Sequence, residues 1–222
     1  STGWGGGGDD FFTAFDTGDT WSYGGSGIDT LGLFWANANP GIGVDVRLSG
    51  PSPHATSALG YHAYFHGMEK LAIYTGAGND TIIGGKRGDV IDAGGGANEV
   101  DAGAGKDRVA YQLGAQNLLD GGAGDDHLTV FSGTSPVYFI VDLYDGDVDD
   151  GNLSVITGFE HYHVYGGEQN DIISLGEQAD FATGGAGQDT IFGKGGRDRL
   201  IGDNGNDELY GGDSGDKLYG KW

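Results

Sequence analysis

The chain has 222 residues and no cysteine, which excludes disulfides, thiolate metal sites and a cysteine nucleophile. Glycine supplies 48 residues, roughly three times its ordinary share of about 7%, but without the G-X-Y period of collagen. The formal net charge is -22, which disfavours nucleic acid and anionic membranes as partners. No apolar run approaches the ~18 residues of a spanning helix, so we do not expect direct membrane insertion.

The N-terminal segment opens with a glycine and aspartate pattern. GGGGDDFFT (5–13) and GGSGIDTLG (24–32) place Asp10 and Asp29 two residues before a large apolar residue. Residues 33–74 then leave this pattern and form an insert. Within it we predict strands at 41–49, where apolar and polar residues alternate, and at 67–74. The first residues lack a signal-peptide pattern and an initiator Met, so we expect a fragment of a longer protein.

The pattern resumes at residue 76 and is interrupted a second time at 131–165. This second insert is predicted to hold strands at 136–144 and 153–165, with an acidic loop at 145–152 between them. From 166 the repeat continues, and its clearest copies are GGAGQDTIF, GKGGRDRLI, GDNGNDELY and GGDSGDKLY, over residues 184–219. A period of nine is too short for a pair of helices and suits a turn followed by a short strand.

A second, longer repeat relates the two halves of the chain. GMEKLAIYTGAGNDTII (67–83) aligns with GFEHYHVYGGEQNDIIS (158–174) at an offset of 91 residues. We therefore predict two tandem copies of one plan, over residues 1–120 and 121–222. Internal periods of this kind indicate a single elongated solenoid, in which neighbouring coils bury each other's apolar faces.

The nine-residue unit reads G-G-x-G-x-D-x-U-x, where U is large and apolar. Its glycines allow a sharp turn that leaves carbonyl oxygens around one cavity, and its Asp adds a carboxylate. Calcium prefers about six to eight oxygen ligands, which two stacked turns can supply and one cannot. If each unit is half a coil, ions are expected between Asp residues 18 positions apart, such as Asp180 and Asp198.

The candidate ligands follow from this spacing. The side chains are Asp10, Asp29, Asp80, Asp89, Asn98, Asp107, Asp126, Asp171, Asp180, Asp189, Asp198, Asp207 and Asp216. The backbone carbonyls are those of Gly76, Gly78, Gly84, Gly103, Gly105, Gly122, Gly124, Gly166, Gly184, Gly185, Gly187, Gly193, Gly195, Gly196, Gly202, Gly205, Gly211 and Gly212. In the first copy the series continues from Asn98 to Gln116 or Asn117. We expect a weak site at Asp80 and Asn98, and none of full strength at Gln116.

These units closely resemble the RTX, or haemolysin-type, calcium-binding nonapeptide repeats, and the resemblance covers most of the chain. It implies an all-β fold, a parallel β-roll with calcium-binding turns, here interrupted by two strand-rich degenerate inserts. It also implies several bound Ca²⁺ ions, folding outside the cell, and passage through a type I exporter. The resemblance thus favours a non-catalytic module of a secreted or cell-surface bacterial protein.

Two other classes of function remain open at this point. A polysaccharide lyase or epimerase, or its auxiliary module, would need a catalytic cluster, and its only candidates are Tyr61, His62, His66 and Lys70. An adhesin or surface-layer module would use calcium to stiffen a stalk. Aromatic residues of the N-terminal part and the inserts could bind carbohydrate or self-associate, but capping or filling the roll is favoured. Glu69 and Glu160 occupy equivalent places in the two copies, for which we expect a structural role.

Overall fold

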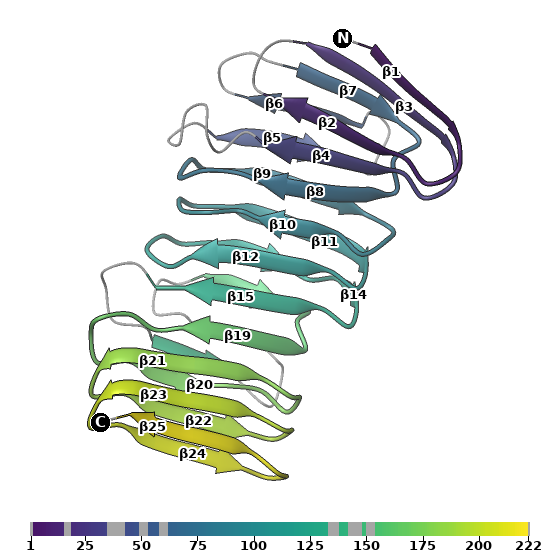
Figure 1. The fold of residues 1–222 in the computed structure, drawn as a ribbon. Coiled ribbons are helices and arrows are strands. Elements are labelled where there is room, and N and C mark those ends of the chain that lie inside the picture. The colour runs from purple at the N-terminus through teal and green to yellow at the C-terminus, as the bar shows by residue number, and fades with distance from the viewer. Residues whose placement is uncertain are drawn as a thin grey trace.

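A computed structural model describes residues 2–15, 19–34, 43–48, 53–57, 62–132, 138–141, 148–149 and 154–221. All of the regular elements in these ranges are β-strands, and they stack along one long axis from the N-terminus to the C-terminus (Figure 1). None of these residues forms a helix of the length and apolarity needed to cross a membrane. The predicted fold class, an all-β parallel β-roll, is confirmed.

The strands belong to three sheets. The first contains, in spatial order, β1 (Thr2–Gly7), β3 (Thr20–Ser26), β7 (His62–His66), β6 (His54–Ser57), β5 (Val44–Arg47), β9 (Thr81–Gly85), β11 (Glu99–Gly105), β13 (Leu118–Asp120) and β18 (Val155–Thr157), with β14 (Ala123–Gly124) paired to β11. The second contains β2 (Phe11–Phe15), β4 (Thr30–Phe34), β8 (Lys70–Tyr74), β10 (Val90–Asp92), β12 (Arg108–Gln112), β15 (His127–Phe131), β19 (His161–Tyr165), β21 (Phe181–Gly187), β23 (Arg199–Gly205) and β25 (Lys217–Lys221). The third contains β17 (Val148–Asp149), β16 (Tyr138–Val141), β20 (Ile172–Ser174), β22 (Thr190–Lys194) and β24 (Glu208–Gly212).

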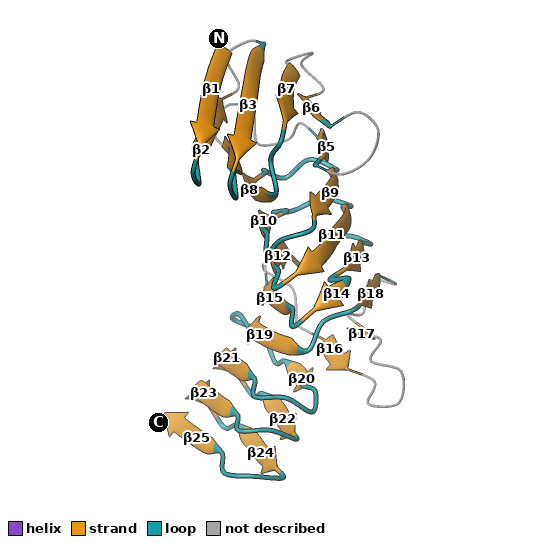
Figure 2. Cartoon of the chain, turned by 90° about the vertical axis from the view of Figure 1, so that its right-hand side faces the viewer, coloured by secondary structure: helices purple, strands orange, loops and turns teal. Residues whose placement is uncertain are grey.

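One coil of the roll takes two nine-residue units, one for each side. In β21 and β23, Ala182 lies opposite Leu200, so the parallel register advances by 18 residues per coil. In Figure 2, β19, β21 and β23 lie on one side of the roll and β20, β22 and β24 on the other. Side chains alternate between the two faces of a strand, so the U residues point inward. Ile191 and Leu200 are accordingly fully buried, and stacked aliphatic side chains fill the space between the sheets.

The two inserts modify this plan without breaking the second sheet. In the first insert, β6 pairs antiparallel with both β5 and β7, which adds a hairpin to the first sheet. The strand predicted at 41–49 is confirmed as β5, with Val44, Val46 and Leu48 buried, whereas Ile42 lies outside the described residues. The division into two copies at residue 120 stays a prediction.

Three predicted insert elements differ in extent. The segment 153–165 holds two strands, β18 and β19, which lie in different sheets because the chain turns at Gly158, where φ is +72°. The strand predicted at 67–74 begins only at Lys70, after a turn at Gly67 with φ of +64°. Of the acidic loop 145–152, only the two residues of β17 are described.

Candidate metal centre

The Asp residues of the repeats form two columns, one along each edge of the roll. The first, here called the long column, precedes the strands of the second sheet and contains Asp10, Asp29, Asp89, Asp107, Asp126, Asp180, Asp198 and Asp216. The second, here called the interrupted column, precedes strands of the first and third sheets and contains Asp80, Asn98 and Asn117, then Asp171, Asp189 and Asp207. Each of these column residues lies immediately before a strand, and the strands pair in parallel from coil to coil, so the short sequence period produces columns along the roll.

Within each column, one carboxylate oxygen joins consecutive coils. Oδ1 of Asp107 accepts a hydrogen bond from the backbone N–H of Asp89 at 2.6 Å. Oδ1 of Asp189 accepts one from the N–H of Asp171 at 2.9 Å. These carboxylates are buried, with Asp89 and Asp107 fully inaccessible to solvent. Each Asp is therefore a coil-to-coil link as well as a candidate ligand.

The other carboxylate oxygen is mostly left without a partner. Oδ2 is buried and accepts no hydrogen bond in Asp10, Asp29, Asp80, Asp107, Asp126, Asp189 and Asp198. Burying a carboxylate is unfavourable, and this desolvation raises the pKa of Asp89 and Asp180 to about 7, even though their Oδ2 atoms accept hydrogen bonds from the N–H groups of Gly85 and Gly176. It raises the pKa of Asp107, Asp189 and Asp198 to about 6. A bound cation would relieve this cost.

Glycine at the first position of a unit keeps a space open beside the unpaired oxygen. A Cβ added to Gly193 would overlap both Oδ2 of Asp198 and the carbonyl oxygen of Gly211. A Cβ on Gly166 would likewise overlap the carbonyl oxygen of Gly184 and Oδ2 of Asp171, although this Oδ2 also accepts a hydrogen bond from the N–H of Gly167 at 3.0 Å. Carboxylate and carbonyl oxygens from consecutive coils thus border one space, and this set of hard, negatively charged ligands fits Ca²⁺.

The structure brings together most of the side chains expected from the sequence. The aligned series are Asp10 with Asp29, Asp89 with Asp107 and Asp126, Asp171 with Asp189 and Asp207, and Asp180 with Asp198 and Asp216. Of the expected carbonyls, those of Gly105, Gly184, Gly187 and Gly211 lie beside a column carboxylate. Ligation by each individual residue, including the remaining glycine carbonyls, stays a prediction.

Hydrogen bonding decides one position that the sequence left open between two residues. Asn117, not Gln116, continues the interrupted column, since its Oδ1 accepts a hydrogen bond from the N–H of Asn98 at 2.9 Å. Glu99 of β11 accordingly lies opposite Leu118 of β13, a spacing of 19 residues. The turn before Asn117 holds one extra residue. A step of 18 residues from Asn98 therefore ends at Gln116, one position before the residue that lies in the column.

Sequence reasoning missed the position of two glutamates in the long column. Oε2 of Glu69 accepts a hydrogen bond from the N–H of Asp29 at 2.9 Å. Oε2 of Glu160 accepts one from the N–H of Asp126 at 2.8 Å. Both therefore occupy the position of the next Asp where the chain leaves an insert. Their spacing in the sequence could have identified them. Glu69 lies two residues before the buried Leu71 and Glu160 two residues before the buried Tyr162, just as each repeat Asp lies two residues before a U residue.

The candidate catalytic residues do not converge. His62 and His66 lie on β7 of the first sheet, whereas Lys70 lies on β8 of the second. The neighbours of all three on their strands, Ala63, Phe65 and Leu71, are buried, so the three side chains face outward from different sheets. Tyr61 lies outside the described residues.

Several of the aromatic residues stack across the strands of the first sheet. Trp4 stacks on Tyr23 with ring centroids 4.2 Å apart, and Trp21 stacks on Tyr64 at 4.3 Å. Trp4 is 75% exposed, so these stacks lie on the outer surface and do not fill the roll. Carbohydrate binding or self-association through them stays a prediction.

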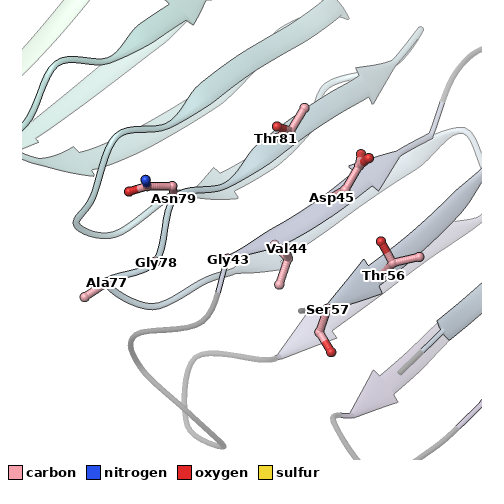
Figure 3. Close-up of a pocket in the computed structure, with 9 residues that line it drawn as sticks. All are labelled: Gly43, Val44, Asp45, Thr56, Ser57, Ala77, Gly78, Asn79 and Thr81. Carbon is pink, nitrogen blue, oxygen red and sulfur yellow. The ribbon is translucent and has the colours of Figure 1, made fainter. Parts of the chain in front are cut away.

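A cavity of about 620 Å³ lies beside the first insert (Figure 3). Asp45, Thr56 and Thr81 line it from neighbouring strands of the first sheet, and Asn79 lines it from a turn. Asp45 is the only charged residue among the described lining residues, and Arg47 forms an ion pair with that carboxylate at 2.9 Å. Among the described lining residues, no second carboxylate pairs with Asp45 in the way that glycoside hydrolysis requires.

Comparison with known families agrees with this geometry. The model of the RTX calcium-binding nonapeptide repeat matches in four copies, at residues 74–109, 114–133, 165–200 and 192–222. These matches cover both columns from Asp80 onward, apart from the second insert. No curated protein matches the chain.

Proposed function

Because the chain belongs to the RTX calcium-binding nonapeptide repeat family, we propose that this calcium-binding β-roll is a calcium-gated folding module of a secreted or cell-surface protein. The observation that carries the proposal is the pair of aspartate columns, in which seven of the described side chains have a buried Oδ2 that accepts no hydrogen bond from the protein. Such columns cost free energy when empty and gain it when a divalent cation lies between consecutive coils.

The gating follows from where calcium is abundant. At low calcium inside a cell, the carboxylates repel one another and the C-terminal coils stay open, which suits threading through a type I exporter. At millimolar calcium outside, bound ions neutralise the columns and tie each turn to the next. Ligands that bind only the folded state stabilise it by mass action, so calcium concentration sets the folded fraction.

We further propose that the module is not itself an enzyme. The separation of His62 and His66 from Lys70 supports this, as does the ion-paired carboxylate in the cavity of the first insert. Incubation with oligomers of acidic polysaccharide should yield neither unsaturated products nor altered sugar ratios. Turnover of such an oligomer by the calcium-loaded chain would favour the lyase or epimerase alternative instead.

A direct test of gating is a calcium titration of the purified chain. Circular dichroism in EDTA should show most of the β-signal lost, and millimolar calcium should restore it. Magnesium at the same concentration is the control, because its smaller octahedral shell suits these turns poorly. Calcium binding measured by equilibrium dialysis should rise with the β-signal. A β-spectrum that neither chelator nor calcium alters would rule the proposal out.

A further inference from the structure

Two turns of the interrupted column carry asparagine where the repeat has aspartate. Asn98 and Asn117 are 3% and 2% exposed, so their amide groups lie as deep in the turn as the carboxylates of neighbouring coils. Each keeps the coil-to-coil link, since Oδ1 of Asn98 accepts a hydrogen bond from the N–H of Asp80 at 3.0 Å. The substitution therefore changes only the second polar atom, which is now a donor.

That second atom points at the carbonyl oxygens of its own turn. Nδ2 of Asn98 donates to the carbonyl oxygen of Ala93 at 3.2 Å and approaches those of Gly95 and Gly96 at 3.5 Å each. Nδ2 of Asn117 donates to the carbonyl oxygen of Ala115 at 2.9 Å. In the aspartate turns the matching atom is Oδ2, which accepts nothing in Asp107, Asp189 and Asp198. In the asparagine turns, the polar atom that replaces Oδ2 therefore has hydrogen-bond partners within its own turn.

We propose that the amides of Asn98 and Asn117 take the place of the cation, so that this edge of the roll is closed without calcium. The inference rests on the proposed function, because it treats calcium as the usual occupant of a turn. It departs from the weak site that the sequence led us to expect at Asp80 and Asn98. The side-chain N–H of each Asn carries partial positive charge and points at the carbonyl oxygens that a cation would otherwise bind. Because Asn98 and Asn117 are uncharged, they do not repel each other as two carboxylates would.

The amides also disfavour calcium as a competitor. To present Oδ1 to an ion, the Asn98 amide would have to rotate, which would set Nδ2 against the N–H of Asp80, donor facing donor. Access is not the obstacle, since an open cavity of about 380 Å³ borders Asp80, Asn98 and Asn117. Hydrogen-bond complementarity therefore decides that the turns of Asn98 and Asn117 stay metal-free.

The closed edge continues beyond the two asparagines. The N–H of Asn117 donates to Oγ of Ser154 at 2.8 Å, which joins β13 to β18 at the second insert. The N–H of Val44 donates to Oδ1 of Asp80 at 2.8 Å, which joins the hairpin of the first insert. The middle of the roll thus has one edge linked without calcium, whereas the coils after Tyr165 have carboxylate columns on both edges. We infer that the middle keeps residual structure without calcium and templates the C-terminal coils when calcium arrives.

Amide hydrogen exchange in EDTA tests the wild-type chain. The N–H of Glu99 donates to the carbonyl oxygen of Asp80, and the N–H of Thr190, 91 residues later, donates to that of Asp171, so the two report on equivalent bonds. Glu99 should exchange roughly tenfold more slowly than Thr190 without calcium, and the difference should vanish when calcium is added. Equal loss of protection at both positions in EDTA would overturn the inference.

The double variant Asn98→Asp/Asn117→Asp tests the amides themselves. It should bind about one or two more calcium ions per chain than wild type. The N–H of Glu99 should also lose its protection from hydrogen exchange in EDTA. Asn79→Asp is the matched control, because Asn79 lies in the preceding coil and its Oδ1 accepts the exposed N–H of Ala97 outside the column. An unchanged ion count in the double variant, with normal binding elsewhere, overturns only this inference. Failure of wild type and variant to bind any calcium overturns the proposed function and the inference with it.

Discussion

The backbone N–H of Asp180 donates a hydrogen bond to Oδ1 of Asp198, 2.9 Å away and 18 residues further along the chain. The N–H of Asp198 then donates to Oδ1 of Asp216 at 3.0 Å. A residue in the middle of a column therefore serves two interfaces, with its carboxylate toward the preceding coil and its N–H toward the following one. Removing it disturbs two junctions at once.

Asp198→Asn and Asp198→Ala should separate the two roles of this residue. The Asn variant keeps an oxygen for the N–H of Asp180 but loses the negative charge, so it should raise the calcium needed for half-maximal folding. The Ala variant also loses the hydrogen bond, which we expect to cost about 1 kcal/mol more in calcium-loaded stability. Gln116→Ala, outside the column, is the control and should change the calcium midpoint little. Calcium titrations followed by circular dichroism measure all three, and equal midpoints would contradict the assignment.

How far the sequence predicts this arrangement depends on whether the period is uniform. The nine-residue unit correctly predicts that Asp89, Asp107 and Asp126 precede strands of one sheet, and that U residues such as Ile91 are buried, because each Asp belongs to a recognisable unit even though the coil from Asp107 to Asp126 is one residue longer than the coil before it. It leaves Gln116 and Asn117 as alternatives because one turn holds an extra residue, and hydrogen bonding, not spacing, selects Asn117.

The nine-residue period also fails to place the two glutamates in the long column, for a related reason. Glu69 aligns with Asp29 across 40 residues, because the hairpin of the first insert lies between them. After each insert the column also moves by two residues, since Oδ1 of Asp89 accepts the N–H of Leu71 and not that of Glu69. These changes of alignment depend on how strands on either side of an insert pair in space. The nine-residue repeat, read within one segment of sequence, does not contain that information.

Gly193→Ala should block a candidate site without straining the backbone. Gly193 lies outside the positive-φ region, so alanine can adopt its conformation, but the new methyl group would overlap Oδ2 of Asp198 and the carbonyl oxygen of Gly211. The variant should bind about one ion fewer and need more calcium to fold. Gly220→Ala is the matched control, because a Cβ there meets nothing within 4 Å. Ion counts by equilibrium dialysis compare the two, and a wild-type count in Gly193→Ala would refute the location of the site.

Glu160→Gln tests whether the junction glutamates act as ligands. Gln preserves an oxygen for the N–H of Asp126, so the link between β15 and β19 should survive. Loss of charge should nevertheless weaken calcium binding at the junction beside Asp126, and Glu69→Gln should do the same beside Asp29. Terbium luminescence, titrated with calcium, reads site affinity directly. Glu208→Gln is a control on an exposed carboxylate outside the columns. If the Glu160 and Glu69 variants match that control in affinity, the role of both residues is structural only.

Without calcium, the folded state should become less stable as pH rises. The pKa of Asp89 and Asp180 is raised by burial from 3.8 to about 7, so the folded chain holds protons that the unfolded chain has already released. Stability from these groups is therefore complete below about pH 4 and is lost between about pH 4 and pH 7. With calcium the trend should reverse, because protons compete with the ion for the same oxygens. Urea unfolding at several pH values, with calcium or with EDTA, measures how the free energy of unfolding changes with pH in each case. The same pH dependence in calcium and in EDTA would contradict this prediction.

Leu200 and Leu218 occupy the same position of the repeat but differ in burial. Leu200 is fully buried between the sheets, whereas Leu218 is 44% exposed in the last described coil. Leu200→Ala should leave a cavity and cost about 2–5 kcal/mol of calcium-loaded stability, a range typical of buried leucines. Leu218→Ala should cost less than about 2 kcal/mol, because less apolar surface is lost from the interior. Urea denaturation in saturating calcium compares the pair, with ion counts confirming that both variants remain loaded. Equal losses would show that the last coil is covered in solution, since only burial distinguishes the two residues.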